Sequence, residues 1–344
     1  MIDLPRLRAA ASRLATRGQR RATVLLYHRI AEPEHDPWSL AVSPAHFGEH
    51  MQVLREHAEV APLSGLRSRI EERGAPRCLV AVTFDDGYAD NTGALAALEH
   101  DDVPATIFVI AGALGTTPWW DRLAHLLLEA GTLPERMSLV LEGTAIERSL
   151  GGSAIYDPRA YDSNRGWRAG MEQPTPRHAL YLELWRLLQP MRHPERERAL
   201  DEIGAWASAT LQSDDARLLT RDELGALAAH PLIDIGGHTI THPRLSALTP
   251  AEQRDEIAGG KRLVEEIVGT RLTSFAYPFG RPEDLTSETV SAVRDAGFDV
   301  ACANYSGTVR ASSDRYRLPR AYVHDCDGDE FERSLSTWLD APSR

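Results

Sequence analysis

The feature that most constrains the fold is an apolar run that ends abruptly in acidic residues. Residues 78–84 read Cys-Leu-Val-Ala-Val-Thr-Phe and are followed at once by Asp85-Asp86-Gly87. A continuous apolar run of this length is typical of a strand that is buried on both faces, as in a parallel sheet. A predicted helix over 94–100 and a second apolar run over 105–110 follow it, which together form a βαβ unit. The pattern therefore predicts an α/β fold.

The same alternation recurs on both sides of a long interruption. Further strands are predicted over 23–27, 233–235, 274–277 and 300–303, and further helices over 44–57, 222–229, 250–268, 287–296 and 331–339. Between about 119 and 219 the alternation stops, and helices are predicted over 121–130, 178–188 and 195–211. We therefore expect one closed or nearly closed barrel over 22–335, interrupted by a mostly helical insertion at about 119–219.

Net charge and cysteine content exclude several classes of protein. The formal net charge is −12, so the field of the molecule repels phosphate backbones and argues against a nucleic-acid partner. The cysteines Cys78, Cys302 and Cys326 are scattered, which gives neither a disulfide framework nor a zinc-finger spacing. Reduced thiols in a cytoplasmic protein are the better interpretation.

The basic segment 1–21 has its own pattern. Leu4, Leu7, Ala11 and Leu14 fall at helical spacing, so a short amphipathic helix is predicted that could rest on an anionic membrane surface. The alternative is a helix that packs on the domain or frays. The apolar run of a secretory signal is missing, and no stretch approaches the ~20 apolar residues of a membrane span. We expect a cytoplasmic protein, with peripheral membrane contact left open.

Two polar clusters suggest a metal site. The adjacent carboxylates of Asp85 and Asp86 repel each other at the end of a buried strand, and a divalent cation would neutralise them. The alternative is that the two carboxylates cap the next helix through its backbone amides. The second cluster, His238-Thr-Ile-Thr-His242, places two imidazoles at i and i+4, which we expect on one face of a helical turn. Gly236 and Gly237 are expected to let the chain bend tightly before this cluster. Asp86 and both histidines make the ligand set of a catalytic metal site with open positions.

A third cluster, Tyr277-Pro-Phe-Gly280, ends another predicted strand, and turn amides in such a position can point at a developing oxyanion. Taken in order, Thr83-Phe-Asp-Asp-Gly87, His238-x-x-x-His242-Pro and Tyr277-Pro-Phe-Gly280 resemble the polysaccharide deacetylase family, also called the NodB-homology family or carbohydrate esterase family 4. The flanks 26–29, 104–109 and 318–320 are similar too. The resemblance covers roughly 22–118 and 217–335 and implies a distorted (β/α) barrel.

The resemblance also implies roles for individual residues. Asp85 matches the general base, and Asp86, His238 and His242 match the ligands of a divalent metal, most often zinc, for which cobalt or nickel substitutes. Such a metal polarises the amide carbonyl and lowers the pKa of a bound water toward ~7, and Asp85 would accept the water proton. By analogy, the backbone N–H of Phe279 would hold the tetrahedral oxyanion.

The chain departs from the family pattern in three places. The late Leu-x-His motif of the family aligns only loosely with this chain, where His324, beside Asp325, is the candidate general acid. His28 is the rival candidate. For both residues the alternative is a histidine with a purely structural role. Ala276 stands where many members have an arginine that orients the base, and we expect Arg320 to reach Asp85 instead. The tryptophan of the fourth family motif is missing near 302–305, which leaves the sugar-stacking wall undefined.

We expect substrate contacts from Tyr88, Tyr277, Trp119 and His28. Packing at the start of a helix is the alternative for Tyr88, and anchoring of the insertion is the alternative for one of the two tryptophans at 119–120. The leading interpretation is a metal-dependent hydrolase that removes an N-acyl group, most simply N-acetyl, from an amino-sugar saccharide or glycan precursor. The alternatives are a hydrolase of a formamide or a cyclic amide or imide, which the family also contains, and a catalytically silent glycan-binding scaffold.

Overall fold

The structure is a computed structural model that describes residues 21–72, 78–129, 131–208 and 216–340. The predicted amphipathic helix within 1–21 lies outside the described residues. Across the part of the chain that is described, no helix is both long and apolar enough to cross a membrane.

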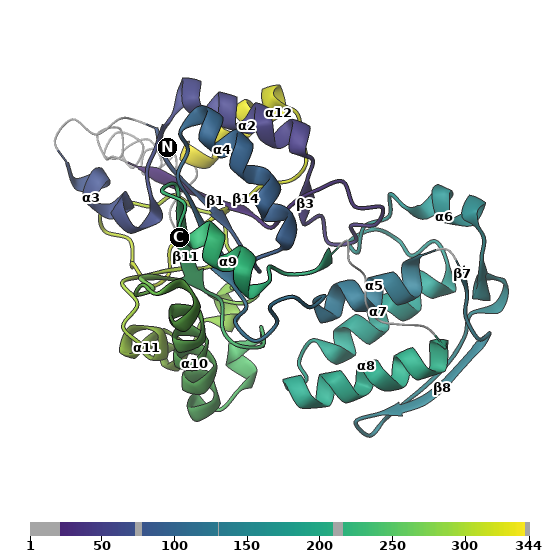
Figure 1. Cartoon of the computed structure of the whole chain (residues 1–344). Helices are drawn as coiled ribbons and strands as arrows, with labels where there is room; N and C mark the ends of the chain where they lie inside the picture. The colour runs from purple at the N-terminus through teal and green to yellow at the C-terminus, as the bar shows by residue number, and fades with distance from the viewer. Residues whose placement is uncertain (1–20, 73–77, 130, 209–215, 341–344) are drawn as a thin grey trace, which may run out of the picture.

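A curled, all-parallel sheet forms the centre of the protein (Figure 1), in the order β13-β12-β11-β6-β5-β1-β14, with β4 also paired to β5. Its strands are β1 (Ala22–Tyr27), β4 (Glu59–Val60), β5 (Leu79–Phe84), β6 (Ala105–Val109), β11 (Ile233–Gly237), β12 (Ser274–Ala276), β13 (Val300–Cys302) and β14 (Ala321–Tyr322). The two edges approach each other, because Cys302 of β13 pairs with Leu318, three residues before β14.

Helices cover the outside of this sheet. They are α2 (Pro44–His57), α3 (Leu66–Glu71), α4 (Leu95–Asp101), α9 (Arg221–Ala228), α10 (Pro250–Val268), α11 (Ser287–Asp295) and α12 (Gly328–Asp340). Shorter elements join them: β2 (Arg29–Ile30), β3 (Ala41–Val42) and the 3-10 turns η1 (Leu63–Gly65), η2 (Ala89–Ala94), η5 (Leu245–Ala247) and η6 (Pro282–Asp284). The prediction for α10 is confirmed at both ends, because Thr249 and Glu252 form a capping box at its start and Gly269 is left-handed at its end.

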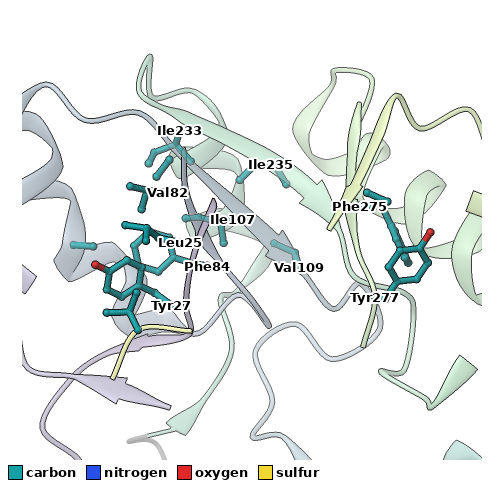
Figure 2. Close-up of a cluster of buried hydrophobic side chains, with 14 of the residues drawn as sticks. Leu25, Tyr27, Val82, Phe84, Ile107, Val109, Ile233, Ile235, Phe275 and Tyr277 are labelled. Atoms are coloured by element: carbon teal, nitrogen blue, oxygen red, sulfur yellow. The ribbon is translucent and has the colours of Figure 1, made fainter. Parts of the chain in front are cut away.

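The apolar strands pack as their sequence predicts. Alternate residues of neighbouring strands form one core cluster against the helices (Figure 2), whose members include Leu25, Tyr27, Val82, Phe84, Ile107, Val109, Ile233, Ile235, Phe275 and Tyr277. β1 and β5 are buried along their whole length, as expected for central strands of a parallel sheet.

The glycines before the histidine motif have a different role from the one predicted. Gly236 and Gly237 do not bend the chain but extend β11 by two residues beyond the predicted strand. A Cβ atom at Gly236 would lie 2.3 Å from the Phe108 ring, and one at Gly237 would lie 2.9 Å from Phe298. Close packing, rather than a sharp bend, therefore requires glycine here.

Residues 119–129 and 131–207 form a lobe beside the barrel (Figure 1), and its apolar side chains pack in a second core cluster that also includes Tyr88, Ile110 and Leu218 of the barrel. The lobe contains α5 (Trp119–Leu128), α6 (Pro158–Asn164), α7 (Pro176–Leu188), α8 (His193–Ala207), η3 (Gly151–Ala154) and the strands β7 (Gly131–Thr132), β8 (Arg136–Leu141), β9 (Thr144–Ser149) and β10 (Ile155–Tyr156). The antiparallel β8–β9 hairpin was not predicted. Its turn is a left-handed pair, Glu142 and Gly143, with φ of 46° and 82°.

Candidate active site

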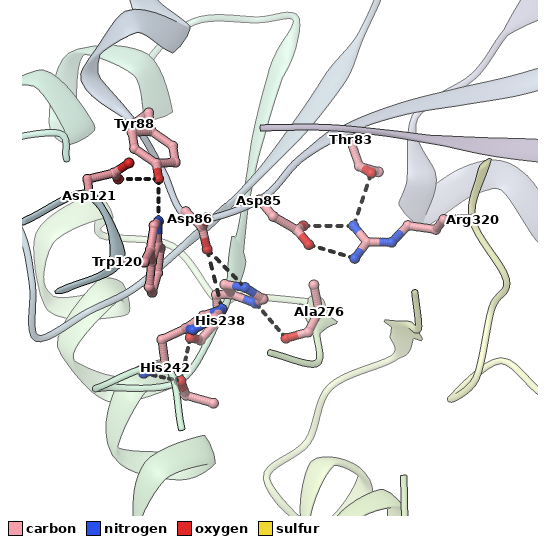
Figure 3. A network of polar contacts seen from close by, with 11 residues as sticks. Thr83, Asp85, Asp86, Tyr88, Trp120, Asp121, His238, His242, Ala276 and Arg320 are labelled. Carbon is pink, nitrogen blue, oxygen red and sulfur yellow. Dashed lines mark hydrogen bonds and ion pairs between the residues drawn. The ribbon is translucent and has the colours of Figure 1, made fainter. Parts of the chain in front are cut away.

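Three buried side chains converge beyond the carboxyl ends of β5 and β11 (Figure 3). The Nε2 atoms of His238 and His242 each lie 3.4 Å from Oδ1 of Asp86. Ligand atoms of the three residues all lie within 4.8 Å of one another, and among the described residues this is the group that meets the geometry of a metal site. Asp86 Oδ1 is buried and accepts no hydrogen bond from the described residues. A buried carboxylate oxygen between two imidazoles fits a divalent cation.

The prediction that the two histidines lie on a helical turn is wrong. His238 directly follows β11, and the chain then forms an irregular loop in which Thr239 and His242 have φ of 68° and 53°. Asp86 is also left-handed, with φ of 71°. Such values are uncommon outside glycine and persist only where surrounding contacts hold the backbone.

Contacts from two sides hold this loop. The Glu256 carboxylate of α10 accepts hydrogen bonds from the backbone N–H of Ile240 and of Thr241, both at 2.9 Å, and from the Thr241 hydroxyl at 2.7 Å. From the lobe, Arg196 of α8 donates to the Thr241 carbonyl at 3.0 Å. The N–H of His242 donates to the Thr239 hydroxyl at 3.0 Å. The loop therefore depends on the barrel and on the lobe together.

The surroundings of the two imidazoles differ. Nδ1 of His238 lies 2.7 Å from the Ala276 carbonyl oxygen, so this nitrogen donates and Nε2 is the nitrogen that faces Asp86. Burial lowers the pKa of His238, but the charges of Asp85 and Asp86 outweigh it and raise the value above the ordinary one. Burial lowers the pKa of His242 to about 3, so that its ring is neutral, as a metal ligand must be.

Asp85 is held by a buried arginine. Arg320, just before β14, is 1% exposed, and its Nη1 and Nη2 donate to the two carboxylate oxygens of Asp85 at 2.7 and 2.6 Å (Figure 3). Nε of the same guanidinium donates to the Ala303 carbonyl at 2.8 Å. Burial raises the pKa of Asp85, but the Arg320 charge, aided by His238, lowers it to about 2. Asp85 is therefore ionised at neutral pH.

A cavity of about 330 Å³ opens over these groups. It is lined by His28, Trp38, Leu40, Asp85, Asp86, Trp120, Trp185, His238, His242, Tyr277, Phe279, Arg281, Asn304, Tyr322 and His324. A volume of this size lies at the lower end of the range for small-molecule sites, about 300–1,000 Å³.

The two candidate general acids both line this cavity, in different surroundings. His28 is buried, and its Nδ1 has no hydrogen-bond partner among the described residues. His324 is exposed, with its ring centroid 4.8 Å from that of Tyr322. Asp325 does not pair with His324, because its carboxylate instead accepts the backbone N–H of Ser43 at 2.9 Å and contacts His46.

Phe279 and Tyr277 shape one wall of the cavity. Phe279 is left-handed, with φ of 59°, and its ring centroid lies 4.9 Å from that of His242. Tyr277 lines the cavity but is 1% exposed, and its hydroxyl donates to the Tyr316 carbonyl at 2.9 Å. A substrate therefore meets the edge of Tyr277 at most, because its hydroxyl is used inside the protein.

Two of the residues expected to contact the substrate, Tyr88 and Trp119, lie behind the cavity wall instead. The hydroxyl of Tyr88 is buried, donating to Asp121 at 2.7 Å and accepting from the Trp120 indole at 2.8 Å (Figure 3). Trp119 is buried against Trp185, with ring centroids 5.9 Å apart. Neither Tyr88 nor Trp119 lines the cavity. Trp120 lines it instead, with its ring centroid 4.8 Å from that of His242.

Several lining residues were missed by the sequence reasoning. Trp38 comes from the loop between β2 and β3, Trp185 from α7 of the lobe, and Asn304 from the loop after β13. Trp185 sits in a predicted helix, but a helical pattern does not say which outward-facing residue meets another part of the chain. A lone aromatic residue in a loop, such as Trp38, gives no stronger signal.

Comparison with known sequences identifies the family. A family profile described as "Polysaccharide deacetylase" matches residues 72–133 and 202–301, which contain the Asp86, His238 and His242 group, Asp85 and the turn after β12. YxkH of Bacillus subtilis, whose name assigns it to the polysaccharide deacetylases, is 31% identical over 105 residues. The chain belongs to the polysaccharide deacetylase family. The match covers 30% of this chain and 36% of YxkH, so it spans about a third of that relative.

Solved structures show the same fold. A polysaccharide deacetylase from Bacillus cereus aligns with a TM-score of 0.56 and 16% identity, over 92% of this chain and 69% of that one. IcaB from Ammonifex degensii aligns with a TM-score of 0.54 and 18% identity, over 94% and 98%. The deacetylase PplD of Streptococcus pyogenes, solved in complex with acetate, aligns with a TM-score of 0.50 and 16% identity, over 92% and 98%. The predicted distorted barrel is therefore confirmed.

Proposed function

We propose that this polysaccharide deacetylase relative is a metal-dependent hydrolase that removes an N-acyl group, most simply N-acetyl, from an amino-sugar saccharide. The observation that carries the proposal is the buried Asp86, His238 and His242 group beside an ionised Asp85 on the floor of one cavity. Family membership supports an amide bond and a saccharide as the target. The acetate in the deacetylase PplD supports acetyl as the acyl group.

In this proposal Asp86, His238 and His242 hold one divalent ion, most simply zinc, with cobalt or nickel as substitutes. The ion would supply Lewis-acid activation of the amide carbonyl and of a water molecule. Asp86 contributes the negative charge, and His238 presents Nε2 because its Nδ1–H is fixed on the Ala276 carbonyl. Burial of all three residues keeps competing water out of this part of the cavity.

Asp85 is the proposed general base. It accepts the proton of the attacking water, which needs an ionised carboxylate beside the reacting carbon. Arg320 keeps Asp85 ionised and fixes both of its oxygens. The proposed oxyanion donor is the backbone N–H of Phe279, in the strained turn at the cavity wall.

The leaving amine must be protonated, and two histidines are candidates. We propose His324 as the general acid, because it lines the cavity at its exposed rim, from which an amine departs. His28 is the rival at the buried end. Comparison of His324→Gln with His28→Gln decides between them: the acid's variant should lose kcat on an N-acetyl sugar while keeping its bound metal.

The test is metal content measured beside acetate release from N-acetylglucosamine oligomers, for wild type, His238→Ala and His57→Ala. His57 is an exposed histidine outside the cavity and serves as the matched control. We expect one divalent ion per chain and acetate release in wild type and His57→Ala, with both lost in His238→Ala. Metal binding without acetate release from any N-acetyl sugar would refute the proposed substrate class and direct the search to formamides and imides. No bound metal after addition of zinc or cobalt would refute the hydrolase and favour a glycan-binding scaffold.

A further inference from the structure

We propose that Trp185 of the lobe and Trp38 of the β2–β3 loop form the surface on which the pyranose ring of the substrate stacks. This inference rests on the proposed function and names the part of the site that recognises the sugar. Both tryptophans lie outside the stretches matched by the family profile, residues 72–133 and 202–301. The family profile therefore does not include the recognition they would provide.

The two indoles form one continuous wall with the metal-ligand group. The ring centroids of Trp38 and Trp185 are 4.3 Å apart, with an angle of 36° between the planes. Trp185 contacts Phe279 edge to face, with centroids 6.5 Å apart, and Phe279 in turn lies 4.9 Å from the ring of His242. An amide at His242 therefore places the attached sugar against this series of rings.

The wall is both available and held in place. Trp38 and Trp185 are half-buried and line the cavity, whereas the neighbouring Trp119 is buried behind them. The indole N–H of Trp38 donates to the Tyr181 hydroxyl at 2.7 Å, which holds the indole in place at the cavity wall. Trp185 is supported from behind by Trp119. A fixed aromatic surface loses little conformational entropy when a ligand binds.

The chemistry of the cavity fits a sugar ring better than an acyl chain. A pyranose presents a face of C–H groups, which packs on flat aromatic surface, and a rim of hydroxyls, which need polar partners. Asn304, Arg281 and His324 line the same cavity and supply such partners. An alkyl chain would offer these polar groups no hydrogen bonds. A volume of about 330 Å³ suits one ring beside the reacting amide.

The test compares Trp185→Leu, which removes the aromatic face, with Trp185→Phe, which keeps one. Trp206→Leu is the matched control, because Trp206 is a half-buried tryptophan of the same lobe that does not line the cavity and donates to the Arg136 carbonyl. Thermal unfolding of each metal-loaded variant checks its folding. Steady-state kinetics use two substrates: an N-acetylglucosamine tetramer and N-(2-hydroxyethyl)acetamide, which has the amide but no ring.

We expect Trp185→Leu to raise KM for the tetramer at least about tenfold, with a smaller change in kcat. The reason is that truncation of an aromatic side chain at a binding surface is among the single changes that weaken binding most. Its kcat/KM for N-(2-hydroxyethyl)acetamide should stay at the wild-type value. Trp185→Phe should retain most of the tetramer affinity, and Trp206→Leu should behave as wild type. Equal losses on both substrates, or no loss on either, would overturn the inference.

Binding separates this inference from the proposed function. Saturation-transfer NMR with the N-acetylglucosamine tetramer reports sugar contact even if wild type releases no acetate. Signal in wild type and Trp206→Leu that is lost in Trp185→Leu supports the stacking wall whatever the reaction is. Acetate release by wild type with unchanged tetramer binding in Trp185→Leu would refute the wall while leaving the hydrolase intact.

Discussion

Replacement of Arg320 by methionine is expected to damage stability and turnover together. The guanidinium is 1% exposed and forms the two short hydrogen bonds to Asp85, one to the Ala303 carbonyl at 2.8 Å and one to the Thr83 hydroxyl at 3.3 Å. Methionine fills much of the volume but leaves Asp85 buried without its counter-charge. Removal of one partner of a buried ion pair typically costs about 3–5 kcal/mol of the free energy of unfolding.

The assay is urea unfolding of the metal-free protein at pH 7, combined with a double-mutant cycle. Arg320→Met and Asp85→Leu should each lower the unfolding midpoint, and the double variant should recover about 1–3 kcal/mol relative to the sum of the single losses. The matched control is Arg271→Met, because Arg271 donates to both carboxylate oxygens of Asp299 at 3.0 Å but is exposed. Exposed ion pairs contribute little, so this variant should unfold almost as wild type.

The same replacement is expected to slow turnover. Arg320→Met should lower kcat on an N-acetyl sugar by at least about 10²-fold, because burial without the guanidinium favours the protonated carboxyl of Asp85 and a protonated group cannot act as a base. An unfolding midpoint equal to that of wild type, additive single losses in the cycle, or unchanged kcat would each refute the reasoning about this pair.

Three further outcomes are expected. Glu256→Gln should weaken metal affinity about 10–100-fold, because the Glu256 carboxylate holds the loop that carries His238 and His242. Competition with a chelator measures this affinity. Unchanged affinity would show that the loop keeps its conformation without Glu256. Burial raises the pKa of Asp121 to about 7, so folding binds a proton and the free energy of unfolding should fall as pH rises from about 4 to 7. Asp121→Asn should flatten this pH dependence, measured by urea unfolding at several pH values. An unaltered pH dependence in the variant would contradict the assignment to Asp121. Gly236→Ala should lower thermal stability by about 1–3 kcal/mol through its clash with Phe108, whereas Gly48→Ala, which meets nothing within 4 Å in a helix, should stabilise the protein or leave it unchanged.

Much of the barrel could be predicted from the sequence because its signals are local. The continuous apolar runs of β5 and β6 identify buried parallel strands without knowledge of their partners. The capping box at Thr249 gives the start of α10 by the same kind of local chemistry. The β8–β9 hairpin was not predicted, because its turn residues Glu-Gly give a weaker hairpin signal than Asn-Gly. Its buried residues are Met137, Leu141 and Ile146.

The sequence by itself determined the chemical inventory of the site. Asp85, Asp86 and the two histidines fall within family motifs at the ends of predicted strands, and parallel strands bring such ends to one edge. The sequence also suggested that Arg320 would reach Asp85, but the bidentate contact that makes this pair depends on the register of β14 beside β1.

Only the tertiary structure decided which surfaces line the cavity. Trp120 lines it while the adjacent Trp119 is buried, since successive residues on a helix point in different directions and the packing of the lobe on the barrel selects one of them. Trp38 and Trp185 are 147 positions apart in the chain and meet because the lobe folds back over the β2–β3 loop. Contacts of this kind leave no periodic pattern in the sequence, since each depends on how two distant parts of the chain are placed against each other.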